Sequence, residues 1–294
     1  MIETIVKTKR STLETYPFCI IIPTWNNLEY LKLCTASILK NSHFINQLII
    51  VINEGADGTA EWVSRQPEMD FIHATQNIGI CYGLNIARSL IKSDYVVYAN
   101  DDMYMLPDWD LQLHREIKNI GHRNFMLSST MIEPVETGNP CVVVRDYGRD
   151  AGSFAEEALL QEFHTLKIPD WNGSTWPPNV VHIDMWDLVG GLSIEFSPGM
   201  YSDPDFSRKL YEAGVRLFKG KGDSLVYHFG SKSTKRIIKS KGRKTFLLKW
   251  GISSRTFTQV YLEMGRKFNS SLRLPVSGRL AEIKNKLKRV KSAW

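Results

Sequence analysis

"VVYANDDMY", residues 96–104, is the stretch that decides the fold. Tyr95 to Ala99 suit a buried β-strand, and that strand runs directly into Asn100, Asp101 and Asp102. Two adjacent carboxylates repel each other and cost free energy to bury unless a positive group lies between them. A strand that ends in this way therefore raises the question of which cation holds the two acids together.

The residues before this stretch alternate between strand and helix patterns. Short apolar runs predict strands at 18–22, 47–52, 70–74 and 94–99. Apolar residues at steps of three and four predict helices at 27–41, 58–65 and 79–93. Strands that are almost continuously apolar and alternate with helices predict a parallel sheet covered on both faces.

Polar residues follow each of these strands. Ligands of a parallel α/β sheet bind beyond the carboxyl ends of its strands. The residues expected at this edge are Pro23-Thr24, Asn53-Glu54, Gln76-Asn77 and Asn100-Asp101-Asp102. Further along the chain, "SDPDF" places two carboxylates just before an amphipathic helix, and "SLVYHFGSKS" predicts a strand that ends on His228.

Bulk composition fits a soluble globular protein. The chain has 294 residues, of which 43% are hydrophobic and 23% charged. Its four cysteines lie far apart, which argues against a disulfide framework and a zinc knuckle and fits a reducing compartment. No apolar stretch is long enough to span a bilayer, and the start lacks the apolar run of a secretory signal. We expect a cytoplasmic protein.

Charge divides the chain into two parts. Residues 232–294 hold 18 Lys and Arg against two Glu, a net charge of +16, so with +6 overall residues 1–231 carry −10. This asymmetry predicts a domain at 1–231 and a basic, mainly helical C-terminal extension at 232–294. It also indicates an anionic partner for the extension, such as a membrane surface, a phosphorylated substrate or nucleic acid.

The last 18 residues have the pattern of an amphipathic helix. Apolar residues recur at steps of three and four, and Lys and Arg occupy the other positions: Leu280, Ile283, Leu287, Val290 and Trp294. This helix either packs on the body with a solvated basic face or docks on anionic lipid at the inner face of the membrane. The pattern does not separate the two interpretations.

A divalent cation is one answer to the question that Asp101 and Asp102 raise. Hard oxygen ligands suit Mg²⁺ or Mn²⁺, and Mg²⁺ usually takes one or two carboxylates together with substrate phosphates. A short acidic motif without further ligands therefore fits a metal–nucleotide site. The alternative is that the two acids only cap the turn before a helix that starts near Asp108.

Four segments in order resemble one enzyme family. They are "CIIIPTWNNLEYLKLCTASIL", "IIVINEGADGT", "ATQNIGICYGLNIARSLIKSDYVVYANDDM" and "YSDPDFSRKLYEAG…VYHFGSKS". Over residues 17–232 they resemble the inverting nucleotide-sugar glycosyltransferases of family 2, most of all a branch with rhamnosyl- and galactosyltransferases. The resemblance implies the GT-A fold, a Rossmann-like, mostly parallel nucleotide-binding sheet flanked by helices.

The resemblance also implies roles for residues at the sheet edge. Pro23 and Thr24 would line the base pocket and Glu54 would hydrogen-bond the base. Asn77 and Gly79 match an N-x-G element beside the nucleotide, where Gly permits close backbone approach. In the D-x-D region Asn100 and Asp101 would face the donor, with Asp101 at the ribose or the sugar.

Metal, base and acceptor residues follow from the same resemblance. Asp102 and His228 would hold Mn²⁺ or Mg²⁺, and Asp203 would be the catalytic carboxylate. As general base it would accept the proton of the acceptor hydroxyl, while the cation offsets charge on the leaving diphosphate. Trp186 either forms an acceptor platform with the neighbouring residues or belongs to the core; the platform set is Trp186, Asp187, Gly190 and Gly191.

These expectations define a hexosyl- or deoxyhexosyltransferase. It would move a sugar from a UDP- or dTDP-linked donor to a saccharide or lipid-linked acceptor in surface polysaccharide or glycoconjugate synthesis. The alternatives are a nucleic-acid-binding protein, suggested by Phe246, Trp250 and Phe257 among basic residues, and an inactive relative that binds nucleotide sugars. The net charge of −10 on residues 1–231 disfavours nucleic acid.

Overall fold

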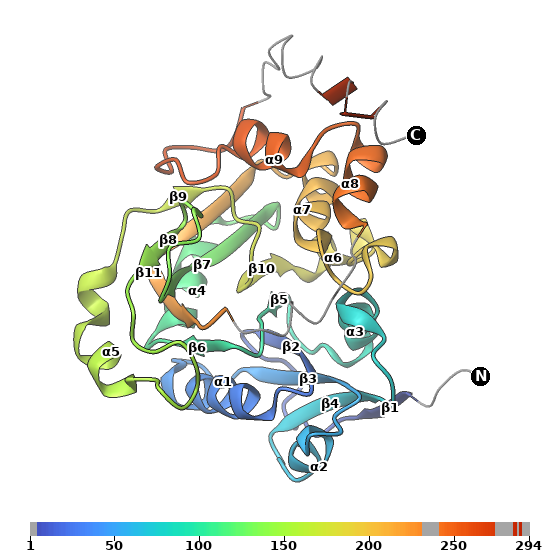
Figure 1. Ribbon diagram of the computed structural model, residues 1–294, viewed down its shortest axis with the longest axis vertical. Helices are drawn as coiled ribbons and strands as arrows, with labels where there is room; N and C mark the ends of the chain where they lie inside the picture. Colours follow the sequence, from blue (N-terminus) through green and yellow to red (C-terminus); the bar gives the residue numbers. More distant parts are fainter. Residues whose placement is uncertain (1–4, 231–240, 274–284, 287, 290–294) are drawn as a thin grey trace.

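Helices pack on both faces of one mixed sheet (Figure 1). A computed structural model describes residues 5–230, 241–273, 285–286 and 288–289. The strands are β1 (Ile5–Thr8), β2 (Cys19–Trp25), β3 (Gln47–Asn53), β4 (Met69–Ala74), β5 (Tyr95–Tyr98), β6 (Met103–Met105), β7 (Phe125–Glu133), β8 (Val142–Val144), β9 (Trp171–Asn172), β10 (Asn179–His182) and β11 (Leu217–His228). The α-helices are α1 (Leu28–Asn41), α2 (Thr59–Ser64), α3 (Gly79–Ala87), α4 (Trp109–Ile120), α5 (Glu156–Glu162), α6 (Ile183–Val189), α7 (Ser202–Glu212), α8 (Gly242–Trp250) and α9 (Ser254–Thr256). The described residues also contain short helical turns: η1 (Arg88–Leu90), η2 (Phe163–Leu166), η3 (Ile194–Phe196) and the π-helical η5 (Phe257–Tyr261).

The predicted parallel core of the sheet is confirmed. The strand order is β1-β4-β3-β2-β5-β10-β7-β11-β6, with β8 beside β7 and β9 beside β11. β4, β3, β2 and β5 are parallel, whereas β10 runs antiparallel between β5 and β7. The carboxyl ends of the four parallel strands therefore lie at one edge, where the polar residues after each strand meet.

Alternate residues of the central strands enter opposite cores. In β2, Cys19 and Ile21 face a cluster formed with α3, α6, α7 and α8, while Ile20 and Ile22 face a cluster with α1 and α4. All four side chains are fully buried. Burial on both faces explains why these strands read as unbroken apolar runs rather than as an alternating pattern.

The helix predicted at 79–93 is too long. α3 ends at Ala87, and after the η1 turn Ile91 is already extended. The buried Gln47 side chain explains this ending, because its amide donates to the Leu90 carbonyl at 2.8 Å and accepts from the Lys92 N–H at 2.8 Å. These bonds take over backbone groups that a longer helix would need.

Part of the C-terminal region shares the core of the sheet. Phe246 in α8 and Phe257 in η5 are fully buried, in the cluster that contains Phe206 of α7. The predicted boundary at residue 231 stays a prediction. The amphipathic helix predicted over 277–294 falls outside the described residues, apart from 285–286 and 288–289. None of the helices in the described part of the chain is long and apolar enough to cross a membrane.

Asp110 joins α4 to the segment after α1. It is fully buried, and its carboxylate accepts hydrogen bonds from the backbone of His43 and Phe44 at 2.8 and 3.1 Å and from the Asn46 amide at 2.8 Å. Asp108, expected to start α4, precedes the helix with a φ of 62° and makes no capping bond. Asp110 thus fixes this corner.

We expect Asp110→Ala to lower the free energy of unfolding by about 3 kcal/mol, because it leaves several buried donors without an acceptor. Urea denaturation followed by circular dichroism measures this. Asp108→Asn is the matched control, since Asn tolerates positive φ and a surface substitution changes stability by less than about 0.5 kcal/mol. Equal midpoints for both variants would contradict this account of Asp110.

Candidate active site

A cavity of about 230 Å³ opens at the carboxyl edge of the parallel strands. Eight residues proposed from the sequence line it: Pro23, Thr24, Asn77, Gly79, Asn100, Asp101, Asp102 and His228. Asn53, which was also expected at this edge, lines it too, together with four residues that the sequence reasoning did not assign: Trp25, Ile80, Pro198 and Gly230. The cavity therefore receives side chains from the ends of β2, β3, β5 and β11.

The two acids after β5 are held in a poorly solvated place. Asp101 and Asp102 are 7% and 6% exposed. Burial and the charge of Asp102 raise the pKa of Asp101, while the neighbouring side chains of Thr24 and Asn27 act in the opposite direction. This pair therefore has a strong electrostatic demand for positive charge.

His228 supplies part of that charge. β6 begins just after Asp102 and pairs antiparallel with the end of β11, so that His228 lies opposite Met103. Its Nε2 is 3.5 Å from Asp102 Oδ1, and its Nδ1 is 2.8 Å from Glu133 Oε1. Burial would lower the pKa of His228, but the two carboxylates outweigh it and raise the pKa to about 10.

Glu133 was not found from the sequence. It is the last residue of β7, is 8% exposed and also accepts a hydrogen bond from the Thr137 hydroxyl at 3.1 Å. The available signal was an acid at the end of the apolar strand "FMLSSTMIE". Because Glu133 engages Nδ1, it turns the Nε2 of His228 toward Asp102 and the cavity.

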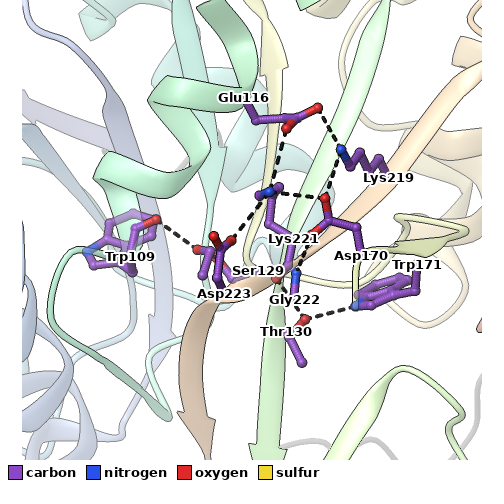
Figure 2. Close-up of polar contacts among 11 residues, drawn as sticks. Trp109, Glu116, Ser129, Thr130, Asp170, Trp171, Lys219, Lys221, Gly222 and Asp223 are labelled. Atoms are coloured by element: carbon purple, nitrogen blue, oxygen red, sulfur yellow. Dashed lines mark hydrogen bonds and ion pairs between the residues drawn. The ribbon is translucent and has the colours of Figure 1, made fainter. Parts of the chain in front are cut away.

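A bulge in β11 sets the position of His228. The pairing of β11 with β7 shifts between Lys221 and Leu225. A network of ion pairs surrounds the bulge (Figure 2): Lys219 and Lys221 both contact Asp170, at 2.8 and 3.0 Å, and Lys219 contacts Glu116 of α4 at 2.8 Å. These contacts anchor the strand upstream of the cavity.

The segment after β4 forms another wall of the cavity. Asn77 accepts a hydrogen bond from the Gly79 N–H at 2.8 Å, and Asn53 accepts one from the Ile78 N–H at 3.0 Å. Gly79 has a φ of +76°, and a Cβ there would lie 2.9 Å from the Pro198 Cα. The close backbone approach expected for this glycine is thus made to Pro198.

Asp203 lies in the first turn of α7, five residues after the cavity-lining Pro198. It is not itself among the lining residues. Its Oδ1 is buried without a hydrogen-bond partner in the described part of the chain, and burial raises its pKa to about 7. The charges of Asp203, Asp102 and Asp101 all add to burial in raising the pKa of Tyr98, so the phenol is within electrostatic reach of both acid groups.

Glu54 does not line the cavity. Its Oε2 accepts hydrogen bonds from Trp25 Nε1 and Asn26 Nδ2, each at 2.9 Å. The geometry therefore does not support a direct contact of Glu54 with a base. Trp25 and Asn53 lie on the cavity wall instead, and Glu54 orients the Trp25 ring.

The residues of the predicted acceptor set lie outside the lining of the cavity. Trp186 is 4% exposed and packs on Phe206 at 5.2 Å between ring centroids, which favours the core interpretation over a sugar platform. Asp187 forms a two-bond ion pair with Arg88, at 2.6 and 2.7 Å. A Cβ on Gly191 would meet the Asn85 amide oxygen at 2.3 Å. Trp186, Asp187, Gly190 and Gly191 do not line the cavity.

Comparison with known proteins agrees with this architecture. One sequence relative is an uncharacterized glycosyltransferase of Mycoplasma genitalium, 29% identical over 100 residues, a match that spans 32% of this chain and 34% of that protein. The chain thus covers about a third of this relative.

Solved structures share the fold at low sequence identity. S. aureus TarS in complex with UDP-GlcNAc is 14% identical with a TM-score of 0.52, covering 73% of this chain and 61% of that one. GalNAc-T7 with UDP, GalNAc and Mn²⁺ is 11% identical with a TM-score of 0.55, covering 73% and 44%. Mannosyltransferase PcManGT of Pyrobaculum calidifontis, with GDP-Man and Mn²⁺, is 15% identical with a TM-score of 0.51, covering 83% and 63%.

A match to a protein-family model, over residues 19–142, falls on the part of the chain that builds the carboxyl edge of the sheet. This part contains β2 to β5, the acidic pair Asp101-Asp102 and Glu133. The fold is GT-A-like, and residues 19–142 match the family described as glycosyl transferase family 2.

Proposed function

We propose that this protein is an inverting glycosyltransferase that uses a nucleotide-sugar donor and a divalent cation. One observation carries the proposal: a single cavity at the sheet edge gathers Asp101, Asp102 and His228, and its Pro198 wall leads to Asp203, whose Oδ1 has no partner among the described residues. Asp101, Asp102 and His228 suit a diphosphate with its cation, and Asp203 suits the abstraction of a proton.

The donor set fits a cation that is shared with a substrate. The described residues contain no group of three His, Cys, Asp or Glu side chains that could hold a metal ion alone. Mg²⁺ and Mn²⁺ in nucleotide sites complete their coordination with phosphate oxygens and water. We propose Asp102 and His228 as protein ligands, with Asp101 facing the donor; a cation bound at Nε2 would displace the proton that His228 otherwise holds there. A cation bound there would offset the charge that develops on the leaving diphosphate.

The chain's own residues then account for the rest of the reaction. The acceptor oxygen attacks the anomeric carbon and forms the new C–O bond as the bond to the diphosphate oxygen breaks. Asp203 Oδ1 accepts the hydroxyl proton, and the leaving diphosphate takes the bonding electrons. The backbone near Gly79 and the Trp25 ring would bind the nucleotide.

The finer assignment extends the proposal to UDP- or dTDP-linked hexoses and deoxyhexoses, as in the rhamnosyl- and galactosyltransferase branch. Neighbours of the same fold were solved with UDP, UDP-GlcNAc or GDP-Man. The basic C-terminal extension would suit a saccharide or lipid-linked acceptor that is used near an anionic membrane. Such acceptors belong to surface polysaccharide synthesis.

The nucleic-acid alternative loses two of its three supporting aromatic residues. Phe246 and Phe257 are fully buried and cannot stack on bases. The inactive-relative alternative differs from our proposal only in turnover.

A panel of nucleotide sugars tests the function. UDP-glucose, UDP-galactose, UDP-GlcNAc, dTDP-rhamnose and GDP-mannose would each be added with and without Mn²⁺ while thermal unfolding is followed. A ligand that binds only the folded state raises the midpoint, so we expect Mn²⁺-dependent stabilisation by at least one donor. No shift with any of them, with Mn²⁺ present, would overturn the proposal, and binding without turnover would favour the inactive relative.

We expect Asp203→Asn to lower turnover of the selected donor by about 10²–10⁴-fold, the usual effect of removing a positioned general base. The amide keeps the shape of the side chain, so Mn²⁺-dependent nucleotide binding measured by calorimetry should stay near that of the wild type. Full activity in this variant would contradict the assignment of the base.

The pKa of Asp203 predicts the pH dependence. Only the carboxylate form accepts a proton, so kcat/KM should rise with pH and level off above a pKa of about 7. An ordinary Asp, with a pKa of about 3.9, would leave the profile flat over this range. Steady-state measurements of kcat/KM between pH 5.5 and 8.5 distinguish these two profiles. A kcat/KM that does not fall below pH 7 would argue against a buried base.

We expect Asp102→Ala to weaken UDP binding only when Mn²⁺ is present, because its proposed contact with the diphosphate runs through the cation. Calorimetric titration of UDP with Mn²⁺ and with EDTA measures both states. Equal losses in the two conditions would show that Asp102 contacts the nucleotide itself.

A further inference from the structure

The backbone of α8 is pressed against the start of α7. A Cβ on Gly242, the first residue of α8, would lie 2.3 Å from the Met200 carbonyl oxygen and 3.0 Å from the Tyr201 ring. Tyr201 directly precedes α7 and has a φ of 74°, a conformation that is uncommon outside glycine. Such a backbone persists only where its surroundings hold it.

The other end of α8 binds the first turn of α7. Trp250 Nε1 donates a hydrogen bond to Asp205 Oδ1 at 2.7 Å, and Lys249 Nζ lies 2.9 Å from the same oxygen. Asp205 is fully buried and stands two residues after Asp203. Because a buried carboxylate requires a partner, these two side chains fix the place of that turn.

Lys249 is itself held in position. Its ammonium also lies 2.7 Å from Glu195 Oε1 and donates to the Ser193 hydroxyl at 2.9 Å, both at or beside η3. The contact with Asp205 is thus one of three directed contacts of this side chain. Between Lys249 and Gly242, Phe246 is fully buried in the same core as α7.

The start of α7 is held from the donor side as well. The Pro198 carbonyl accepts a hydrogen bond from the Ile80 N–H at 3.0 Å, and both residues line the cavity. Residues 198–203 therefore run from the proposed donor site to the proposed base. They are bound at one end by the segment after β4 and at the other by α8.

We propose that α8 is a positioning element for the base: Lys249 and Trp250, through Asp205, set where the Asp203 carboxylate stands relative to the cavity. This inference rests on the proposed function and goes beyond it, because it makes part of the basic C-terminal region necessary for turnover. Lys249 and Trp250 act through α7 and need no contact with substrate.

The test compares Lys249→Met with the matched control Lys244→Met. Both residues are exposed, and both variants remove one charge from α8 and keep the apolar stem, but Lys244 lies five residues before the side chain that contacts Asp205. With the donor selected from the panel, we expect Lys249→Met to lower kcat by about 10- to 100-fold, the effect of a small misplacement of a catalytic group. UDP affinity with Mn²⁺ should stay within about twofold, and Lys249→Arg should restore most of the rate. Lys244→Met should leave kcat unchanged.

Two further measurements separate positioning from general damage. In an Asp203→Asn background, adding Lys249→Met should not slow the residual turnover further, because α8 acts through that carboxylate. Hydrogen exchange in Lys249→Met and in Trp250→Phe should increase at 199–206 and stay unchanged in the central strands. This measurement does not require a donor.

The outcomes distinguish the two proposals. Wild-type kcat in Lys249→Met together with an inactive Asp203→Asn would overturn the role of α8 and leave the proposed function intact. An active Asp203→Asn variant would overturn the base itself. If the losses of turnover in Asp203→Asn and Lys249→Met multiply in the double variant, α8 only stabilises the fold. The same follows if hydrogen exchange rises throughout the protein in Lys249→Met.

Discussion

The burial of two adjacent carboxylates at the end of β5 is the constraint on which the site depends. Asp101 and Asp102 are less than a tenth exposed, and their mutual repulsion opposes ionisation of both. The neighbouring Thr24 and Asn27 side chains act against the rise in the pKa of Asp101, and the imidazole of His228 lies beside Asp102. The demand of this acidic pair for positive charge is the reason for proposing a cation and a diphosphate at this edge.

The part of the sheet beyond β5, where parallel and antiparallel pairings mix, brings His228 to that place. β6 starts at the residue after Asp102, and β11 pairs with it so that His228 stands opposite Met103. The Phe229 N–H then donates to the Asp102 carbonyl at 3.1 Å. Residues more than a hundred positions apart thus become neighbours through three backbone pairings, while Glu133 at the end of β7 fixes which ring nitrogen faces the cavity.

The sequence predicted those features that depend on local pattern. Continuously apolar strands indicated a sheet buried on both faces, and the polar residues that follow them marked its edge. The sequence could not predict Glu133, because its partner His228 lies 95 residues away and the pairing exists only after β7 and β11 meet. The sequence left Trp186 open between core and platform for a related reason: an aromatic residue beside Asp187 looks the same whether it faces a sugar or, as here, packs on Phe206. α3 ends earlier than predicted because the side chain of Gln47, on β3, binds the backbone of Leu90 and Lys92 beyond it, which a longer helix would need.

The two acids of α7 show how one helical turn can hold opposite electrostatic environments. Oδ1 of Asp205 takes the indole of Trp250 and the ammonium of Lys249, so a cation stabilises its charge, although its Oδ2 is also buried without a partner among the described residues. Asp203, two residues earlier, has a buried oxygen with no partner in the described chain and a pKa raised to about 7. If Lys249 reached Asp203 instead, the same ammonium would favour the charged form and make the carboxylate a weak base. Because the Lys249 ammonium binds Asp205, α8 fixes this turn of α7 without lowering the basicity of Asp203. A general base requires both a fixed position and a carboxylate whose pKa is not lowered by a nearby positive charge.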